Sequence, residues 1–386
     1  MQLRDIIVVG LQPWGIKIGS NCKNIAIEFA KNNRVLYVNS PMDLNTLRKK
    51  NKLKERKKGL EQVAENIWVL TPSKIILSAN WLPFTAAFKL INKWNNKRFA
   101  GDINRAIKEL GFRNFMLFND SDMFRSFHLK ELLNPVIDLY YTRDNLLSQQ
   151  YWHKHGHIIE PEIMRKSTLV VANSVWLAEI AKCYNHNSFD VGQGCDLTVF
   201  DHTVNRNRPD DLPLAEGPII GYIGALSSLR LDIDLLVKLC STKPEWTFVF
   251  VGNEDAAFEK SALHDLRNVF FLGSKKEKEL PDYLAGFDVA INPQAVNELT
   301  IGNYPRKIDE YLALGKPVVA TDTATMTIFS DVVYLSKSVQ EYIENIKKAI
   351  SENSSQLATK RIQVAQSHTW ENSVAKIYDA IKLVSK

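Results

Sequence analysis

The chain has 386 residues, of which 49 are lysine or arginine and 43 are aspartate or glutamate, for a formal net charge of +6. Segment 48–58 alone holds eight basic residues and one acidic residue, so the rest of the chain is close to neutral. This distribution argues against a nucleic-acid-binding body, because proteins that follow a phosphate backbone spread cationic charge over a face or a domain. The length favours two domains, and 45% hydrophobic and 24% charged residues are typical of a folded soluble protein.

The cysteines indicate a reducing compartment. Cys22, Cys183, Cys195 and Cys240 lie far apart without CxxC spacing, which predicts neither a disulfide framework nor a zinc site. The apolar run that ends at Gly10 is too short for a signal peptide, and no uncharged apolar stretch reaches the roughly 18 residues of a membrane span. We therefore expect a cytoplasmic protein.

Short β-rich apolar runs alternate with amphipathic stretches along the chain, which is typical of parallel sheets covered by helices. In the first half, helices are expected at 21–31 and 103–110, each followed by an asparagine or glycine stop signal. The expected strands of this half are 6–10, 34–39, 67–71, 114–118, 136–141, 169–172 and 188–191.

A polar stretch with three prolines, 201–218, separates this half from a second α/β series. The second series has expected strands at 219–223, 247–251, 269–272, 289–292, 317–320 and 332–335. The last segment, from 370 to 384, is amphipathic at helical spacing and can pack on either half. The predicted domains are 1–200, a linker at 201–218, 219–368, and a final helical segment at 369–386.

The predicted fold class is α/β, with two Rossmann-like parallel-sheet domains that face each other across a cleft. Ligands of open parallel sheets bind beyond the carboxyl ends of the strands. Residues in the loops that follow the strands are therefore the candidates for chemistry.

The strongest local motif is NYPRKIDEYLALGKPVVAT, at 303–321. Pro305 suits the first turn of a helix, and Gly315 suits the position just past its end. The helix would begin directly after a loop that contains Gly302, and a helix N-terminus offers unpaired N–H groups and a positive dipole end to a phosphate.

Arg306 and Lys307 stand in the first turn of this helix, where cations are unfavourable for the helix dipole. A bound diphosphate explains their place, and Glu310 one turn later can accept hydrogen bonds from ribose hydroxyls. The alternative is an exposed helix on which Glu310 forms a surface pair with Arg306 or Lys307.

This helix and the strand after it resemble the donor-binding segment of GT-B glycosyltransferases, especially glycosyltransferase family 4. The resemblance continues in GYIGA at 221–225, FVFVG at 248–252 and GCDLTVF at 194–200. Four further motifs resemble the teichuronic acid type of bacterial polysaccharide glycosyltransferases: VGLQPWGIKIGSN, YYTRDNL, VVANS and VGQGCDL.

The resemblance implies a nucleotide-sugar site in the second half, with a UDP- or GDP-sugar as substrate and no obligatory metal or other cofactor. Glu310 matches the second glutamate of the family's Glu-x7-Glu pair, which holds the ribose, whereas the first glutamate is replaced by Gly302. Glu298 is a candidate for a displaced carboxylate, and the identity of the sugar stays open. The other residues expected to bind the donor are Gly224, Gly252, Gly302, Tyr304 and Arg306.

Arg230 matches the family's basic residue facing the donor diphosphate, and we place it with Lys307 among the catalytic candidates. A solvated arginine at a helix start is the alternative. A dinucleotide-binding site is disfavoured, because neither the glycines at 10–19 nor those at 221–224 satisfy GxGxxG.

The first half is expected to bind the acceptor. Gly15, Gly19, Ser20 and Asn21 join the first strand to a helix capped by Ser20 or Asn21. Their loop either cradles the anion or sugar of a lipid-diphosphate acceptor or is a glycine loop shaped by the fold.

Arg143 and Asp144 follow the strand that ends in YYT, so both should project from its carboxyl end. Asp144 is a candidate base for the acceptor hydroxyl, and Arg143 is a candidate for holding phosphate or orienting that acid. A structural ion pair or a helix cap is the alternative. Asp120 and Asp122, after another strand, are the next candidates.

His153, His155 and His157 alternate in WHKHGH. A loop of surface histidines is favoured over a metal site, since no Asp-x-Asp stands beside them and GT-B enzymes stabilise the leaving diphosphate without a bound divalent ion. His155 is a candidate acceptor contact.

The leading hypothesis is a glycosyltransferase that moves a sugar from a nucleotide diphosphate to a lipid-linked glycan acceptor in cell-surface polysaccharide synthesis. Family 4 implies retention of configuration, whereas a true base at Asp144 would permit inversion. Two alternatives are a non-catalytic nucleotide-sugar-binding or partner protein and a nucleotide-sugar epimerase.

The basic segment 48–58 precedes the aromatic-rich WLPFTAAF at 81–88. Both suit the surface of an anionic membrane, so we expect a peripheral protein at the cytoplasmic face of the membrane. A solvated basic loop is the alternative.

Overall fold

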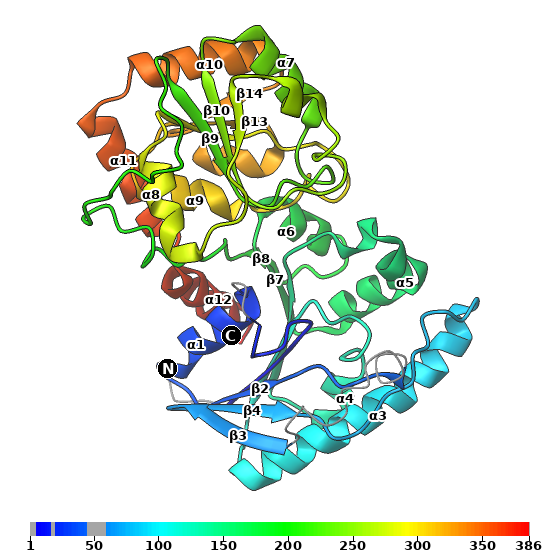
Figure 1. The fold of residues 1–386 in the computed structure, drawn as a ribbon. Coiled ribbons are helices and arrows are strands. Elements are labelled where there is room, and N and C mark those ends of the chain that lie inside the picture. The colour runs from blue at the N-terminus through cyan, green and yellow to red at the C-terminus, as the bar shows by residue number, and fades with distance from the viewer. Residues whose placement is uncertain (1–4, 17–19, 45–58, 386) are drawn as a thin grey trace. The chain divides into compact units, whose positions relative to one another are not determined.

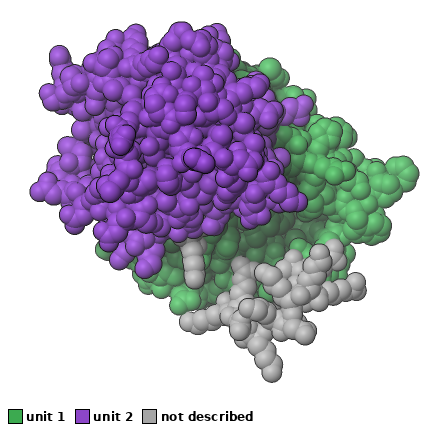
Figure 2. Space-filling model, turned by 45° about the horizontal axis from the view of Figure 1, so that its top comes forward, with its two compact units in different colours: residues 1–192, 373–386 green, residues 193–372 purple. Residues whose placement is uncertain are grey.

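The computed structural model describes residues 5–16, 20–44 and 59–385 (Figure 1). Segment 48–58 and Gly19 therefore lie outside the described residues. The chain divides into two compact units: unit 1 comprises residues 1–192 and 373–386, and unit 2 comprises residues 193–372 (Figure 2). The stretch 201–218, expected as a linker, is part of unit 2.

Unit 1 is built on a mixed eight-stranded sheet in the order β3-β4-β2-β1-β5-β6-β7-β8. All neighbours pair in parallel except β3, which runs antiparallel to β4 along the edge. The strands are β1 (Ile6–Gly10), β2 (Val35–Val38), β3 (Gly59–Ala64), β4 (Ile67–Thr71), β5 (Met116–Asp120), β6 (Ile137–Thr142), β7 (Leu169–Ala172) and β8 (Ser188–Asp190).

Helices cover this sheet, and their ends follow local signals. Helix α1 (Asn21–Ala30) begins at Ser20, whose hydroxyl accepts a hydrogen bond from the Lys23 amide, and α3 (Thr85–Leu110) ends at Gly111 in the left-handed conformation. The remaining elements are α4 (Leu129–Leu133), the 3₁₀ turn η1 (Leu146–Ser148), α5 (Gln150–Lys166), α6 (Val175–Lys182) and the final helix α12 (Trp370–Val384). No described helix is long and apolar enough to cross a membrane.

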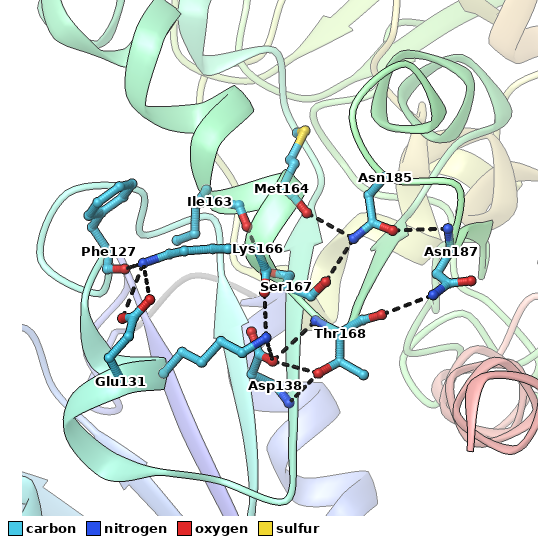
Figure 3. A network of polar contacts seen from close by, with 11 residues as sticks. Phe127, Glu131, Asp138, Ile163, Met164, Lys166, Ser167, Thr168, Asn185 and Asn187 are labelled. Atoms are coloured by element: carbon cyan, nitrogen blue, oxygen red, sulfur yellow. Dashed lines mark hydrogen bonds and ion pairs between the residues drawn. The ribbon is translucent and has the colours of Figure 1, made fainter. Parts of the chain in front are cut away.

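A paired polar network closes the amino-terminal ends of β6 and β7 (Figure 3). Asp138 accepts hydrogen bonds from the Thr168 hydroxyl at 2.6 Å and from the Lys130 ammonium at 2.7 Å. Lys166 donates to Glu131 at 3.0 Å, and the Asn185 amide donates to the carbonyls of Met164 and Ser167. These bonds fix the connections that enter both strands. The polar residues at the amino-terminal ends of β6 and β7 therefore stabilise the fold.

Unit 2 is built on a wholly parallel six-stranded sheet in the order β11-β10-β9-β12-β13-β14. Its strands are β9 (Ile219–Ile223), β10 (Thr247–Val251), β11 (Val269–Phe271), β12 (Val289–Asn292), β13 (Val318–Thr321) and β14 (Tyr334–Ser336). The strand order reverses between β9 and β12. In doubly wound sheets this switch point is where ligands bind, at the carboxyl ends of the strands.

Apolar side chains cover both faces of the unit 2 sheet. Ile219 and Val249 pack with Leu312 on one face, while Ile220 and Phe248 pack on the other. The helices are α7 (Ile233–Thr242), α8 (Leu280–Ala285), α9 (Arg306–Ala313), α10 (Val339–Ser351) and α11 (Ser355–Ser367), with 3₁₀ turns η2 (Ala262–Asp265), η3 (Glu277–Glu279) and η4 (Ala324–Phe329). The predicted α/β fold with two Rossmann-like sheets is confirmed.

Three expectations need correction. The WHKHGH histidines lie in helix α5 rather than in a loop. Helix α3 begins at Thr85, well before the expected residue 103. Residues 201–218 also pack firmly within unit 2: Leu212 lies in its core, and Asp211 accepts a hydrogen bond from the Tyr283 hydroxyl at 2.7 Å.

A buried carboxyl group in unit 1 predicts how stability depends on pH. Glu160 of α5 accepts a hydrogen bond from the Tyr140 hydroxyl at 2.8 Å, and burial raises the pKa of Glu160 to about 7. The folded chain thus retains a proton that the unfolded chain loses near pH 4.5, so stability falls as pH rises through this interval.

Replacement of Glu160 by glutamine keeps an acceptor for Tyr140 and removes the titration. The unfolding free energy of the unmodified chain falls between pH 5 and pH 8. We expect this fall to be smaller in Glu160→Gln by up to about 3 kcal/mol, at about 1.36 kcal/mol per pKa unit. Urea unfolding at both pH values measures it, with Glu65→Gln on the surface as control. An unchanged pH dependence in Glu160→Gln would contradict the assignment.

Candidate active site

Tyr311 anchors helix α9 to the carboxyl end of β9. Its hydroxyl donates to the Ile223 carbonyl at 3.1 Å and accepts from the Ile223 amide at 2.9 Å. Lys307 lies one helical turn before Tyr311 and is therefore carried over Gly224, the residue that directly follows the strand. A Cβ atom on Gly224 would lie 2.7 Å from the Lys307 ammonium nitrogen. The structure thus brings together two residues that the sequence placed at the donor site.

The Lys307 ammonium rests on Tyr222. Its nitrogen lies 4.1 Å from the centroid of the tyrosine ring and donates to the tyrosine hydroxyl. A cation over an aromatic face is attracted by the ring, which orders its side chain. Lys307 is therefore positioned at the end of β9.

Gly224 and Gly252 bring two strand ends into direct backbone contact. Their φ angles are +144° and +157°, and a Cβ atom on Gly252 would lie 1.9 Å from the Gly224 carbonyl oxygen. Side chains are excluded at both positions, which leaves bare backbone at the carboxyl ends of β9 and β10.

Arg306 and Glu310 form an ion pair along α9, with the arginine Nε 3.3 Å from the glutamate Oε1. The pair proposed from the sequence is present, but the Glu310 side chain is only 17% exposed. Burial raises the pKa of Glu310, and the charge of Arg306 opposes this shift. A largely buried carboxylate at this point of the helix is more than a surface partner for arginine.

The loop before α9 holds a polar residue that the sequence reasoning missed. Asn303 is 7% exposed, and neither atom of its side-chain amide has a hydrogen-bond partner in the described part of the chain. The Nδ2 of Asn292, at the end of β12, is also buried without a partner there. Asn303 directly follows Gly302, where the family's first glutamate is replaced, and that adjacency is the signal that could have identified it.

Tyr304 is engaged within unit 2. Its hydroxyl donates to Asp309 Oδ2 at 2.8 Å and lies 3.0 Å from Nδ1 of His368, which is 2.7 Å from Asp309 Oδ1. Burial raises the pKa of Asp309, and His368 opposes the shift. This network holds the first turns of α9 against the end of α11.

Arg230 lies in the loop after β9, at the switch point. The Arg230 carbonyl accepts from the Ala295 amide at 2.9 Å, and the Asn297 side chain donates to the Leu229 carbonyl at 3.0 Å. These bonds join the loops that follow β9 and β12, the second of which also carries the exposed Glu298. The guanidinium of Arg230 is exposed and has no ionic partner among the described residues.

In unit 1, Arg143 bridges two carboxylates at the ends of β5 and β6. Its Nε donates to Asp120 at 2.8 Å and its Nη1 donates to Asp144 at 3.1 Å. Asp144 remains 31% exposed, whereas Asp120 is fully buried and its Oδ2 has no partner in the described chain. Burial raises the pKa of Asp120, and Arg143 counteracts this shift.

Asp122, the other candidate acid, already forms an ion pair with a neighbouring arginine. It is buried and pairs with Arg125, whose Nε lies 2.9 Å from its Oδ2. Asp144 is therefore the only one of the three candidate aspartates that solvent reaches to a substantial extent.

The loop after β1 is closed by Ser20. Its hydroxyl caps α1 and donates to the Gln12 side chain at 2.6 Å, and Asn21 is the first residue of the helix. Gly15 lies in an exposed part of this loop, and a Cβ atom there would meet no atom within 4 Å. The Ser20 hydroxyl thus serves the fold, and Gly15 is open to solvent.

Unit 1 also contains a pocket of about 830 Å³ that the sequence did not indicate. It opens beside the loops after β1, β2, β4 and β5, and its walls mix aromatic rings with amides and cations. Among its lining residues are Trp81, Phe124, Trp152, Asn92, Arg125 and Lys154. Such a lining suits a ligand that has apolar faces as well as hydroxyl or anionic groups.

His155 is a core residue rather than part of this pocket lining. It stacks on Phe88 with ring centroids 4.3 Å apart, and its Nδ1 lies 3.1 Å from the Thr85 hydroxyl. His153 and His157 stack on each other along the outer side of α5. Within the described ranges, no group of three or more His, Cys, Asp or Glu side chains is arranged to hold a metal ion.

A family of known proteins matches the second unit of the chain. Residues 217–352 match the family "Glycosyl transferases group 1". The chain is also 31% identical over 190 residues to the "Putative teichuronic acid biosynthesis glycosyltransferase TuaH" of Bacillus subtilis (strain 168). That alignment covers 47% of this chain and 46% of the relative, so the chain matches about half the length of this curated protein.

Solved structures match over nearly the whole chain. Sucrose-phosphate synthase from Thermosynechococcus elongatus superposes with a TM-score of 0.69 at 14% identity, covering 99% of both chains. HepE of Anabaena, in complex with UDP, superposes with a TM-score of 0.67 at 15% identity, covering 98% of this chain and 100% of that chain. The chain therefore has the GT-B fold, and its resemblance to GT-B glycosyltransferases of the teichuronic acid type is confirmed.

Proposed function

We propose that this chain, a GT-B protein with a group 1 glycosyltransferase domain at 217–352, transfers a sugar from a nucleotide diphosphate to a glycan acceptor. The observation that carries the proposal is the arrangement at the end of β9, where Lys307 lies over Gly224 and Glu310 is buried one turn along α9. HepE, a fold relative, is described in complexes with UDP and with UDP-glucose.

On the donor side, each residue has a role that its chemistry suits. Lys307 and Arg230 neutralise the charge that develops on the departing diphosphate, because preorganised cations act most strongly in the transition state. Glu310 accepts hydrogen bonds from the ribose hydroxyls, and Arg306 orients Glu310. The bare backbone at Gly224 and Gly252 lets phosphate oxygens approach, and the loop that holds Gly302 and Tyr304 borders the sugar.

The unpaired amide of Asn303 gives this donor site a neutral contact to the sugar, one residue after the position where the family has a carboxylate. An amide both donates and accepts hydrogen bonds, so it suits sugar hydroxyls. Glu298 is the alternative contact, from the exposed loop after β12.

On the acceptor side, Asp144 removes the proton of the attacking hydroxyl, and Arg143 fixes the orientation of this carboxylate. Gly15, Ser20 and Asn21 border the acceptor beside the end of β1, and Gly19, which lies outside the described residues, is assigned to the acceptor site with them. His155 supports this region indirectly through Phe88 and Thr85. In this scheme no metal ion or other cofactor takes part.

We further propose that the acceptor is lipid-linked and that the chain works at the cytoplasmic face of a membrane, in cell-surface polysaccharide synthesis. The support is the charge of segment 48–58 and the name of the curated relative, which assigns that protein to teichuronic acid biosynthesis. Anionic leaflets attract such basic segments.

Thermal unfolding with and without nucleotides tests the donor assignment. UDP, GDP and ADP are compared at equal concentrations, since at a given concentration the tighter ligand of the folded state raises the unfolding temperature more. We expect UDP or GDP to stabilise the chain. If none of the three nucleotides shifts the transition, the donor site is not where we propose.

Asp144→Asn separates chemistry from binding. Loss of a general base is expected to lower the turnover of sugar transfer by about 10²–10⁴-fold, while the dissociation constant of the nucleotide stays within about two-fold. Steady-state rates and calorimetric titration measure the two effects, with Asp122→Asn to report the cost of losing a structural carboxylate. Near-normal turnover in Asp144→Asn would remove it as the base.

A further inference from the structure

Large apolar side chains are exposed on unit 1 around the start of α3. Trp81, Phe84 and Leu90 are 68%, 73% and 75% exposed, and Trp94 is 45% exposed. Single exposed apolar residues are ordinary, but four large ones within 14 residues form a patch that calls for a partner. Trp81 and Phe84 precede α3, and its first turns, which carry Leu90 and Trp94, extend away from the sheet (Figure 1).

The helical spacing joins this patch to positive charge. Leu90 and Trp94 are four residues apart, and Lys93 and Lys97 follow each of them by three, so all four share one side of the helix. Both lysines are exposed. No acidic residue occurs between Glu65 and Asp102, whereas that interval holds five basic residues.

The patch adjoins the mouth of the 830 Å³ pocket. Leu77 and Trp81 belong both to the exposed apolar residues and to the pocket lining. The ammonium of Lys154 also lines the pocket and donates to the Trp81 carbonyl at 2.9 Å. A partner that covers the patch therefore meets the opening of the pocket.

We propose that Trp81, Phe84, Leu90 and Trp94, with Lys93 and Lys97, form a docking surface for an anionic lipid bilayer, which brings the pocket to the membrane. The inference deepens the proposed function and rests on it only for the lipid-linked nature of the acceptor. It does not depend on segment 48–58.

The charges favour a bilayer over a second copy of the chain. A symmetric contact places the same patch on both sides, so the lysines of one copy would face those of the other. Anionic headgroups instead complement the lysines. Tryptophan rings favour the headgroup region, and lysine stems can lie along apolar surface while their ammonium groups stay in water.

Vesicle co-sedimentation of the full chain tests this proposal. Anionic vesicles of phosphatidylcholine with about one third phosphatidylglycerol are compared with pure phosphatidylcholine vesicles. Both kinds are tested at low and at high salt. We expect binding to the anionic vesicles, weakened about ten-fold or more in Phe84→Ser/Leu90→Ser. Lys93→Gln/Lys97→Gln should bind more weakly and show a smaller salt dependence than the unmodified chain.

Matched controls come from unit 2. Leu214→Ser removes an apolar side chain that is 93% exposed, and Lys238→Gln/Lys347→Gln removes two exposed lysines. Both controls should bind vesicles as the unmodified chain does. Binding of nucleotide diphosphate by every variant reports on the donor site separately, so failure of docking and failure of the proposed function are distinguishable.

Three results would overturn the proposal. One is the absence of binding to anionic vesicles by the unmodified chain. A second is undiminished binding by Phe84→Ser/Leu90→Ser, including the case in which neutralising 48–58 abolishes it. The third is concentration-dependent self-association that Phe84→Ser/Leu90→Ser removes, with no difference between the two kinds of vesicle.

Discussion

Replacing Lys307 with alanine is expected to lower the turnover of sugar transfer by about 10²–10³-fold, the cost of removing one preorganised group that stabilises transition-state charge. The ammonium lies over Gly224 and rests on the Tyr222 ring, so its charge is already in place before the diphosphate departs. Substrate affinity should fall less than turnover, because the charge on the leaving group grows during the reaction.

Steady-state rates for Lys307→Ala and Lys307→Arg, with titration of the nucleotide diphosphate, measure this difference. Lys307→Arg should recover part of the rate, since it restores the charge with a different geometry. Lys278→Ala, at an exposed lysine of unit 2, serves as the control for loss of charge alone. A normal turnover in Lys307→Ala would exclude Lys307 from the reaction.

Replacing Glu310 with alanine is expected to weaken nucleotide binding by about 10–100-fold, which corresponds to the roughly 1.5–3 kcal/mol of hydrogen bonds to a charged group. Glu310 is largely buried and its contact with Arg306 is 3.3 Å, longer than a well-formed charged hydrogen bond. The carboxylate therefore retains capacity for a ribose hydroxyl. Glu259→Ala, at an exposed acid of the same unit to which no role is assigned, is the matched control.

Nucleotides that lack the ribose hydroxyls sharpen this test. The unmodified chain should bind a 2′,3′-dideoxynucleoside diphosphate about 10-fold or more less tightly than the ribonucleotide, and Glu310→Ala should bind the two about equally. If the variant still discriminates between them as strongly as the unmodified chain, Glu310 does not contact the ribose.

Most strands of both sheets could be predicted because each is a short apolar run between polar or glycine-containing segments. β4, β7, β9, β10 and β12 lie where the sequence places them. β3 could not be predicted in this way, because it is an edge strand whose residues are mostly exposed and whose pattern is set by pairing with β4.

The long helices of unit 1 were harder to predict, for a different reason. The first turns of α3 expose a leucine, a lysine and a tryptophan, and α5 contains Gly156 and Pro161, so neither segment shows an undisturbed helical pattern. Packing decides these elements. His155 illustrates this, since its stacking on Phe88 joins α5 to α3.

The candidate site divides in the same way. Gly224, Lys307 and Glu310 could be selected from spacing and resemblance, because all of them lie in continuous motifs around strand ends. Asn303 and the pocket beside Trp81 could not, since an unpaired amide and a cavity exist only once distant segments are packed. The bridge from Arg143 to Asp120 likewise joins the ends of two strands.

The most direct test of the central claim is to incubate the chain with UDP-, GDP- and ADP-sugars, with and without membrane lipid from a polysaccharide-producing bacterium, and to measure nucleotide diphosphate release and new glycoside. If the chain is a glycosyltransferase, nucleotide diphosphate is released from one class of sugar nucleotide and only when the lipid acceptor is present. The amount released equals the amount of glycoside formed. Binding without consumption under every condition, or isomerised sugar nucleotide in the absence of acceptor, would contradict that account.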